Sequence, residues 1–297
     1  MRTSYQTTNG TNLNYNAPPM RLWQKAKKYG IWNPNDIDFS QDYIDWRNFS
    51  EEERAITMRT LVQFQTGEEA VTLDLLPLIM AISKEGRLEE EIFLTSFLWE
   101  EAKHVDGFNR FFREVIKEEG DLSHHIKMIP SYGVLFNEML PTAMNILITD
   151  PSPVNMARAS VTYNMIVESV LAETGYYSFY MTLSDLGVMP GLQEFIGKLK
   201  QDESRHIAYG IFLLSRLIAE YGDPVWEAIQ DQMNTLMIPA MSIVTETFAG
   251  FDPIPFGQDP NTYTQYALEQ FNKRWKRLER ARTQSLAEVY GEELESV

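Results

Sequence analysis

Two Glu-x-x-His motifs constrain the fold of this chain more than any other feature. The first motif spans residues 101–104 and the second spans residues 203–206. One glutamate, Glu68 or Glu168, precedes each motif at a similar distance in the sequence. Residues three apart lie on one face of an α-helix, so each motif directs a carboxylate and an imidazole to the same point. Four helices that supply Glu, Glu-x-x-His, Glu and Glu-x-x-His predict an all-α bundle around a dinuclear metal site.

The composition excludes several classes of protein. A net charge of −16 argues against a surface that binds nucleic acid or anionic membranes, because phosphate binding needs concentrated Lys and Arg. Cysteine is absent, which excludes disulfides, thiolate metal sites, Fe–S clusters and cysteine nucleophiles. Residues 1–17 lack the apolar segment of a signal peptide, and no apolar stretch is long enough to span a bilayer. We therefore expect a cytoplasmic protein without a transmembrane segment.

Local sequence signals divide the 297 residues into three parts. Residues 1–49 are predicted to be an irregular N-terminal lead-in, residues 50–250 a metal-binding helical bundle, and residues 251–297 a loop and a charged helix packed on it. Ser50 and Glu53 form a capping box at the start of the bundle, and Pro77 is expected to kink its first helix. The predicted helices cover about 50–83, 88–119, 132–147, 153–186, 190–221, 224–249 and 262–290. No stretch alternates apolar and polar residues as a sheet requires.

A metal site explains the paired motifs better than an acidic bundle without metal does. A single Glu-x-x-His is weak evidence, but the chain has only four histidines, and two of them occupy this motif. Apolar residues flank both motifs, and burying unpaired carboxylates is costly, whereas four carboxylates match the charge of two divalent cations. Oxygen and imidazole ligands favour Fe or Mn over Cu(I), and zinc stays open on ligand type alone.

Three further polar residues have more than one interpretation. Asp202 directly precedes Glu203, so it either accepts a hydrogen bond from a ligand imidazole or is an ordinary solvated aspartate. His124 and His125 lie in a predicted connection between helices, where surface histidines are the expected interpretation.

Beyond its ligand spacing, the chain resembles the ribonucleotide reductase small-subunit superfamily, whose fold is ferritin-like. The resemblance runs from about Trp32 to Ala249. It includes the segments Asp36-Ile37-Asp38, Asp45-Trp46, Trp99-Glu100-Glu101-Ala102-Lys103-His104 and Asp202-Glu203-Ser204-Arg205-His206. In reductase subunits of this superfamily a radical tyrosine lies four residues after the first ligand histidine. This chain has Phe108 there, which argues against the usual tyrosyl-radical mechanism.

Within the superfamily the chain looks most like the R2-like ligand-binding oxidases. Glu68 stands where many reductase subunits carry Asp, a feature that these oxidases share with the Mn/Fe reductase subunits. Val71 matches a valine that the oxidases join covalently to a tyrosine, and Tyr163 matches that tyrosine. The acidic end, 291–297, lacks an obvious tyrosine-bearing tail for docking a large reductase subunit. A Mn/Fe reductase small subunit is the alternative, and a ferritin-like iron-handling protein is a more distant one.

The resemblance implies a specific metal centre and reaction. A mixed Mn/Fe pair, or a di-iron form, activates O2 for a two-electron oxidation that leaves a Val71–Tyr163 ether, and a long-chain fatty acid binds with its carboxylate on the metals. A homodimer is also implied. By the same resemblance, the Mn ligands are Glu68, Glu101 and His104, the Fe ligands are Glu168, Glu203 and His206, and Glu101 bridges the two metals.

Helical geometry supports one of the two cross-link positions more readily than the other. Val71 follows Glu68 by three residues and therefore points toward the metals. Tyr163 precedes Glu168 by five residues, which places it about 140° away around an ideal helix. A local distortion such as a π-bulge would bring it inward. Without the resemblance, Val71 would be read as ordinary core and Tyr163 as a half-buried aromatic.

Overall fold

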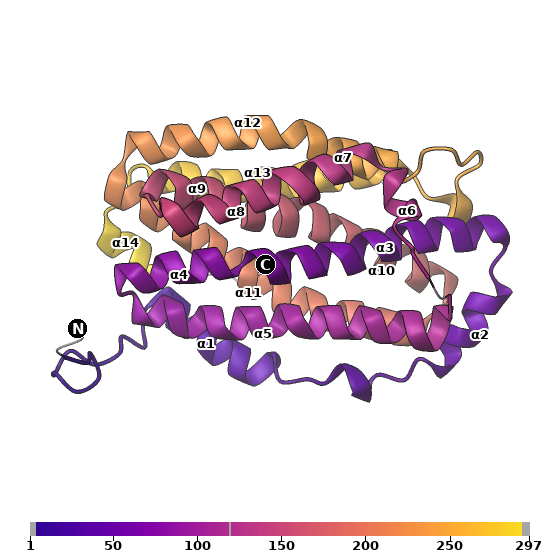
Figure 1. Cartoon of the computed structure of the whole chain (residues 1–297), viewed down its shortest axis with the longest axis horizontal. Helices are drawn as coiled ribbons and strands as arrows, with labels where there is room; N and C mark the ends of the chain where they lie inside the picture. Colours follow the sequence, from indigo (N-terminus) through magenta and orange to yellow (C-terminus); the bar gives the residue numbers. More distant parts are fainter. Residues whose placement is uncertain (1–3, 119, 293–297) are drawn as a thin grey trace.

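Every regular element that the computed structural model shows within residues 4–118 and 120–292 is a helix (Figure 1). The first half contains α1 (Pro18–Tyr29), η1 (Pro34–Asp36), α2 (Ser40–Asn48), α3 (Glu51–Asp74), α4 (Leu76–Glu85), α5 (Leu88–Phe111), η2 (Phe112–Ile116), α6 (His124–Lys127), α7 (Pro130–Gly133), η3 (Val134–Met139) and α8 (Leu140–Thr149). The second half contains α9 (Pro153–Ser160), η4 (Val161–Ala172), α10 (Glu173–Leu186), α11 (Pro190–Tyr221), α12 (Asp223–Glu246), η5 (Pro255–Gly257), α13 (Pro260–Ala281) and α14 (Leu286–Gly291). In this part of the chain no helix is both long and apolar enough to cross a membrane.

Several helix boundaries follow the local signals in the sequence. Ser50 and Glu53 form the predicted capping box at the start of α3. The chain bends before Pro77, where α3 gives way to α4, because proline cannot continue the backbone hydrogen bonds of the preceding turn. Gly86 and Gly187 end α4 and α10 in the left-handed conformation that glycine adopts without strain. The predicted end of the second helix at 119 lies outside the described residues.

The N-terminal part is more regular than the sequence predicts. Residues 1–49 were expected to be irregular, yet they contain α1 and α2. Both prolines at the start of α1 occupy the first turn, where a missing N–H costs nothing, and the helix buries Leu22 and Ala26 in the bundle. Packing against α5 and α11 therefore stabilises a short helix that its own sequence does not strongly favour. In α2, the carboxylate of Asp42 accepts hydrogen bonds from the backbone N–H groups of Gly191 and Leu192, which caps α11.

The C-terminal part also differs in detail from the prediction of one helix over 262–290. The structure has α13 and α14, separated by a second capping box between Ser285 and Glu288 that starts a new helix. Ala267 and Leu278 of α13 lie in the main hydrophobic core, so this segment packs on the bundle. Residues 293–297 of the acidic end lie outside the described residues. The division at residues 50 and 250 stays a prediction.

The central helices carry the site at the boundary between two apolar clusters. One cluster includes Val71 and Phe97, and the other includes Leu61 and Phe108. Four helices pass from one cluster to the other. Going along the chain, α5 and the continuous α9–η4–α10 helix run from the first cluster to the second, whereas α3 and α11 run from the second to the first. The candidate metal ligands lie where each helix makes this passage, so apolar layers close the site above and below.

A π-helical segment, η4, interrupts the helix that carries Glu168. It spans Val161–Ala172, and hydrogen bonding of this kind joins residues five apart instead of four. The distortion required to turn both Tyr163 and Glu168 inward is therefore present. Gly210 of α11 faces this segment, and a Cβ there would overlap the side chain of Asn164.

We predict that Gly210→Ala lowers the free energy of unfolding by about 1–3 kcal/mol, as overpacking in a core does. The new methyl would push against the Cβ of Asn164, close to the π-helical backbone, where little can yield. Chemical denaturation monitored by circular dichroism measures the change.

Gly197→Ala is the matched control on the same helix. A Cβ at Gly197 meets nothing within 4 Å, so this change should leave stability unaltered or raise it by up to about 1 kcal/mol through helix propensity. Equal destabilisation by both substitutions would contradict a close approach specific to Gly210.

Candidate metal centre

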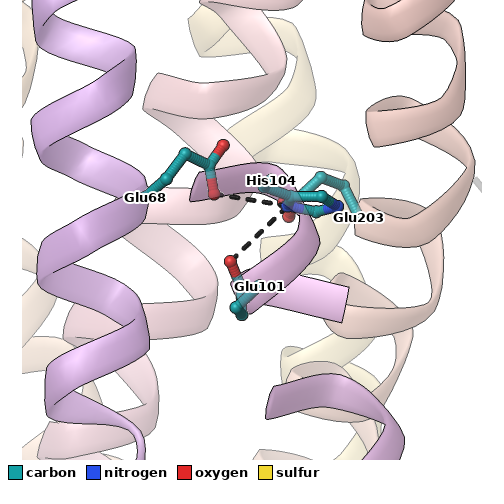
Figure 2. A group of neighbouring side chains, drawn as sticks. All are labelled: Glu68, Glu101, His104 and Glu203. Atoms are coloured by element: carbon teal, nitrogen blue, oxygen red, sulfur yellow. Dashed lines mark hydrogen bonds and ion pairs between the residues drawn. The ribbon is translucent and has the colours of Figure 1, made fainter. Parts of the chain in front are cut away.

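The structure brings the six candidate ligands together in the middle of the bundle. Glu68 comes from α3, two ligands come from α5, Glu168 comes from η4, and two come from α11. In Figure 2, Glu68 and Glu203 reach in from different helices, with Glu101 and His104 of α5 beside them. Two overlapping sets have one ligand atom per residue within 4.8 Å of one another. The sets are Glu68, Glu101, His104 and Glu203, and Glu101, Glu168, Glu203 and His206.

Two glutamates, Glu101 and Glu203, belong to both sets. One oxygen of Glu101 lies 3.6 Å from Nδ1 of His104, and its other oxygen lies 3.1 Å from Nδ1 of His206. The corresponding distances for Glu203 are 3.5 and 3.6 Å. Both carboxylates can therefore span two ions, whereas the resemblance assigned the bridge to Glu101 alone.

The unpartnered atoms of the cluster fit a pair of divalent cations. Both oxygens of Glu101, one oxygen each of Glu168 and Glu203, and Nδ1 of His206 are buried without a hydrogen-bond partner in the described structure. Buried polar atoms normally have partners, and these converge on one point. Four carboxylates balance two divalent charges, and oxygen with imidazole suits Mn, Fe or Zn.

Without ions, protons supply part of the balancing charge. Burial raises the pKa of Glu68 to about 7, with His104 opposing the rise. Burial and repulsion from Glu203 raise the pKa of Glu168 well above its usual range. Burial also disfavours a protonated His104, but the surrounding carboxylates outweigh it and raise the pKa of this imidazole. Burial opposes ionisation of Glu101 too, yet the neighbouring His104 and His206 imidazoles favour the charged carboxylate and lower its pKa to about 2. Divalent cations must therefore displace protons, and acid favours the ion-free form.

Val71 and Tyr163 lie together beside the ligand cluster. Both are buried, and the Tyr163 hydroxyl donates a hydrogen bond to the backbone oxygen of Val71 at 3.1 Å. Burial, with added repulsion from Glu101 and Glu168, raises the pKa of Tyr163 well above its usual value, so the phenol stays protonated. Phe108 is also buried, and it packs against Phe64 and Phe195.

An apolar pocket leads from the protein surface to the ligands. Its volume is about 830 Å³ when the part open to solvent is included. Four ligand carboxylates and Val71 line its inner end, and Phe64, Phe136 and Phe248 line its walls. His124 and His125 lie away from this site, on α6.

Comparison with known proteins identifies the family. The sequence matches the model of "Ribonucleotide reductase, small chain" over residues 14–282. The R2-like ligand-binding oxidase from Sulfolobus acidocaldarius superposes with a TM-score of 0.88 and 35% identity, covering 97% of this chain and 99% of that one. A variant of an R2-like ligand-binding oxidase with a Mn/Fe cofactor superposes with a TM-score of 0.86 and 38% identity, covering 93% of this chain and 98% of that one. Another variant, which holds a non-activated Mn/Mn cofactor, has the same TM-score, identity and coverage of both chains.

The chain belongs to the R2-like ligand-binding oxidases, within the ribonucleotide reductase small-chain family. The predicted family and the predicted all-α, ferritin-like fold are therefore confirmed.

Two outer carboxylates, Asp202 and Glu100, contact the candidate ligand histidines from outside the cluster. Oδ2 of Asp202 lies 3.4 Å from Nε2 of His104, and Oε2 of Glu100 lies 2.9 Å from Nε2 of His206. Each outer carboxylate directly precedes the glutamate of one Glu-x-x-His motif in the sequence but contacts the histidine of the other motif. The structure resolves the open question about Asp202 in favour of the imidazole partner. Glu100 was missed as a functional residue, although its position before Glu101 repeats that of Asp202 before Glu203.

Cations neutralise the outer carboxylates. Lys103 donates to Asp202 at 3.0 Å, and Arg205 donates to Glu100 at 2.7 Å and also contacts Asp202. These bases occupy the same position in the two Glu-x-x-His motifs. Gly30 accepts a hydrogen bond from Lys103 at 2.7 Å, and a Cβ at Gly30 would overlap Glu100. Each motif therefore has a support role as well as two ligands.

We predict that Asp202→Asn or Glu100→Gln weakens Mn(II) binding by about 10- to 100-fold, because the outer carboxylate orients the imidazole and raises its basicity. Binding to the metal-free protein is measured by calorimetry, and circular dichroism checks that the variants are folded.

Glu69→Gln removes the same charge from an exposed residue adjacent to the ligand Glu68. This control should bind Mn(II) nearly as the unchanged protein does. If all three variants bind equally, the outer carboxylates have no specific role.

Proposed function

We propose that this chain is an O2-activating oxidase with one Mn and one Fe in its centre. The proposal is supported by the donor set, by the Mn/Fe cofactor of a related oxidase, and above all by the contact of Tyr163 with Val71 beside the ligands. A di-iron form is the alternative loading. The proposed assignment gives Glu68, Glu101 and His104 to Mn, and Glu168, Glu203 and His206 to Fe.

The proposed internal product is an ether between Cβ of Val71 and the phenolic oxygen of Tyr163. The tertiary C–H bond at Cβ is the weakest in the valine side chain, yet it resists ordinary reagents. When bound, the metal pair supplies two electrons for the reduction of O2 to two waters, and formation of the ether supplies the other two. The C–H bond of Val71 and the O–H bond of Tyr163 break, the C–O bond forms, and two protons leave.

The proposed ligand of the pocket is a long-chain fatty acid. Phe64, Phe136 and Phe248 offer apolar contacts to an alkyl tail, and the inner end reaches the ligand carboxylates. Without metals the cluster offers no net positive charge to another carboxylate, so the fatty acid should bind only when the metals supply it. Ligand and metals are therefore expected to bind together.

Two other functions make different predictions. A Mn/Fe reductase small subunit would turn over only with a large subunit and would keep Val71 unlinked. A ferritin-like iron store would take up many irons per chain.

A homodimer and a cytoplasmic location belong to the main proposal. The exposed apolar side chains of Leu73, Leu76 and Met80 offer one surface for a second copy.

We predict that aerobic loading with Mn(II) and Fe(II) joins the peptides of Val71 and Tyr163, with the loss of two hydrogens. Peptide mass spectrometry detects the joined species. Tyr163→Phe keeps the ring but removes the phenolic oxygen, so it should abolish the link while metals still bind. Unlinked peptides in a protein that has consumed O2 would falsify the ether proposal.

We predict that Gly67→Leu prevents fatty-acid binding. A Cβ at Gly67 lies only 3.4 Å from the hydroxyl of Tyr132 and 3.7 Å from the Phe136 ring, so a leucine must extend into the pocket. Fatty acid extracted from the metal-loaded protein is quantified by mass spectrometry.

The graded control is Gly67→Ala, whose single methyl fits at these distances and should retain most of the lipid. Full occupancy in Gly67→Leu would show that the fatty acid binds elsewhere.

A further inference from the structure

Tyr209 is a buried tyrosine that lies close to the metal centre without being one of its ligands. It follows His206 by three residues on α11, which corresponds to about 4.5 Å of helix rise. Its ring is fully buried, and its hydroxyl donates a hydrogen bond to Oε2 of Glu90 at 3.0 Å. Glu90 is 1% exposed, and its other oxygen lies 3.2 Å from Nε of Arg216. Tyr209 therefore has a fixed proton acceptor, Glu90, which is not one of the candidate metal ligands.

Aromatic rings connect this tyrosine to a ligand imidazole. The Phe97 ring stacks on His206 with a centroid separation of 3.7 Å. Phe97 lies 6.1 Å from Phe93, and Phe93 lies 5.2 Å from Tyr209. The rings leave no solvent between the centre and Tyr209, because all four residues are fully buried.

The same series of rings continues toward the surface. Tyr209 lies 6.3 Å from Phe212, and Phe212 lies 5.3 Å from Tyr290. Tyr290 is partly exposed, and its hydroxyl accepts a hydrogen bond from Arg87 at 3.2 Å. Arg87, Tyr290 and Glu90 line a polar pocket that residues of the N-terminal segment complete. Tyr290 is thus within reach of small solutes.

Two other buried tyrosines near the centre lack this combination. Tyr163 is used in the proposed ether. Tyr176 donates its hydroxyl proton to Oε1 of Glu68 at 2.6 Å, so its acceptor is a candidate metal ligand. Its ring stacks on Phe64, within the apolar cluster on the other side of the site from Tyr209.

We propose that Tyr209 is a redox-active tyrosine, with Glu90 as its proton acceptor, that exchanges electrons between the metal centre and Tyr290 at the surface. This inference rests on the proposed O2-activating function. It addresses a need which that function creates, since the ether forms once, and any later reaction with O2 must draw its electrons from elsewhere.

The transfer balances in two steps. Tyr209 gives one electron to the oxidised centre and its phenolic proton to Glu90, which becomes neutral. Tyr290 then gives one electron to the Tyr209 radical and releases its own proton to solvent, while Glu90 returns the first proton to Tyr209. A soluble one-electron reductant in the polar pocket restores Tyr290, with a proton taken from solvent.

The test uses the Tyr163→Phe background, in which the ether cannot form. After aerobic loading with Mn(II) and Fe(II), rapid-freeze electron paramagnetic resonance should show a tyrosyl radical. Adding Tyr209→Phe should remove the signal, whereas adding Tyr177→Phe, a control tyrosine that stacks on Tyr266 outside the ligand cluster, should retain it. Glu90→Gln keeps an acceptor oxygen but is a far weaker base, so it should slow radical formation by about 100-fold.

Two results of this test would overturn the inference. One is a signal of equal size with and without Tyr209, and the other is O2 consumption without any tyrosyl signal. If the loaded protein consumes no O2, the proposed function fails, and the relay is then judged on the metal-free protein.

The metal-free protein gives a second readout that does not depend on O2 chemistry. Electron exchange between the two tyrosines is reversible, so a soluble photo-oxidant that removes an electron from Tyr290 should leave part of the radical population on Tyr209. Transient absorbance should show this buried radical as a longer-lived component. Both Tyr209→Phe and Tyr290→Phe should abolish the buried radical. Its persistence in either variant would refute the route.

Discussion

The rest of the structure depends on the burial of four carboxylates and two imidazoles at one point of a helical bundle. Such a cluster is stable only if positive charge enters with it, as protons or as metal ions. The raised pKa values of Glu68 and Glu168 show the first solution, and the unpartnered oxygens of Glu101 and Glu203 are suited to the second. The two apolar clusters on either side exclude water and keep this charge balance local.

The outer carboxylates make the two halves of the bundle interdependent. Asp202 accompanies one motif but contacts His104 of the other, and Glu100 does the reverse for His206. Lys103 forms an ion pair with Asp202, and Arg205 forms one with Glu100, so both outer carboxylates are neutralised. Neither motif could hold its histidine correctly alone, so the duplicated sequence pattern corresponds to one indivisible site and not to two independent ones.

The ligand residues were predictable from the sequence because helical periodicity and residue chemistry specify them directly. The helices α1 and α2 of the N-terminal segment could not be predicted in this way. Packing on the bundle stabilises α1, and Asp42 of α2 accepts hydrogen bonds from the backbone at the start of α11, and no local sequence pattern indicates either contact. Glu100 had a local signal, its position before Glu101. That signal can be interpreted only once Asp202 is known to contact the histidine of the other motif. Val71 and Tyr163 required the family resemblance, since each also fits an ordinary core.

The π-helical segment shows why periodicity alone could not place Tyr163. On an ideal α-helix Tyr163 and Glu168 would point in directions about 140° apart, so one of them would leave the site. Hydrogen bonding across five residues turns both inward, and the Asn164 side chain between them donates to Glu168 at 2.9 Å. The small surface of Gly210 leaves room for Asn164. Tyr163 and Glu168 thus face the same site from one helix because a glycine on the neighbouring helix leaves room for the distortion. A pattern read along a single helix cannot express this dependence between distant residues.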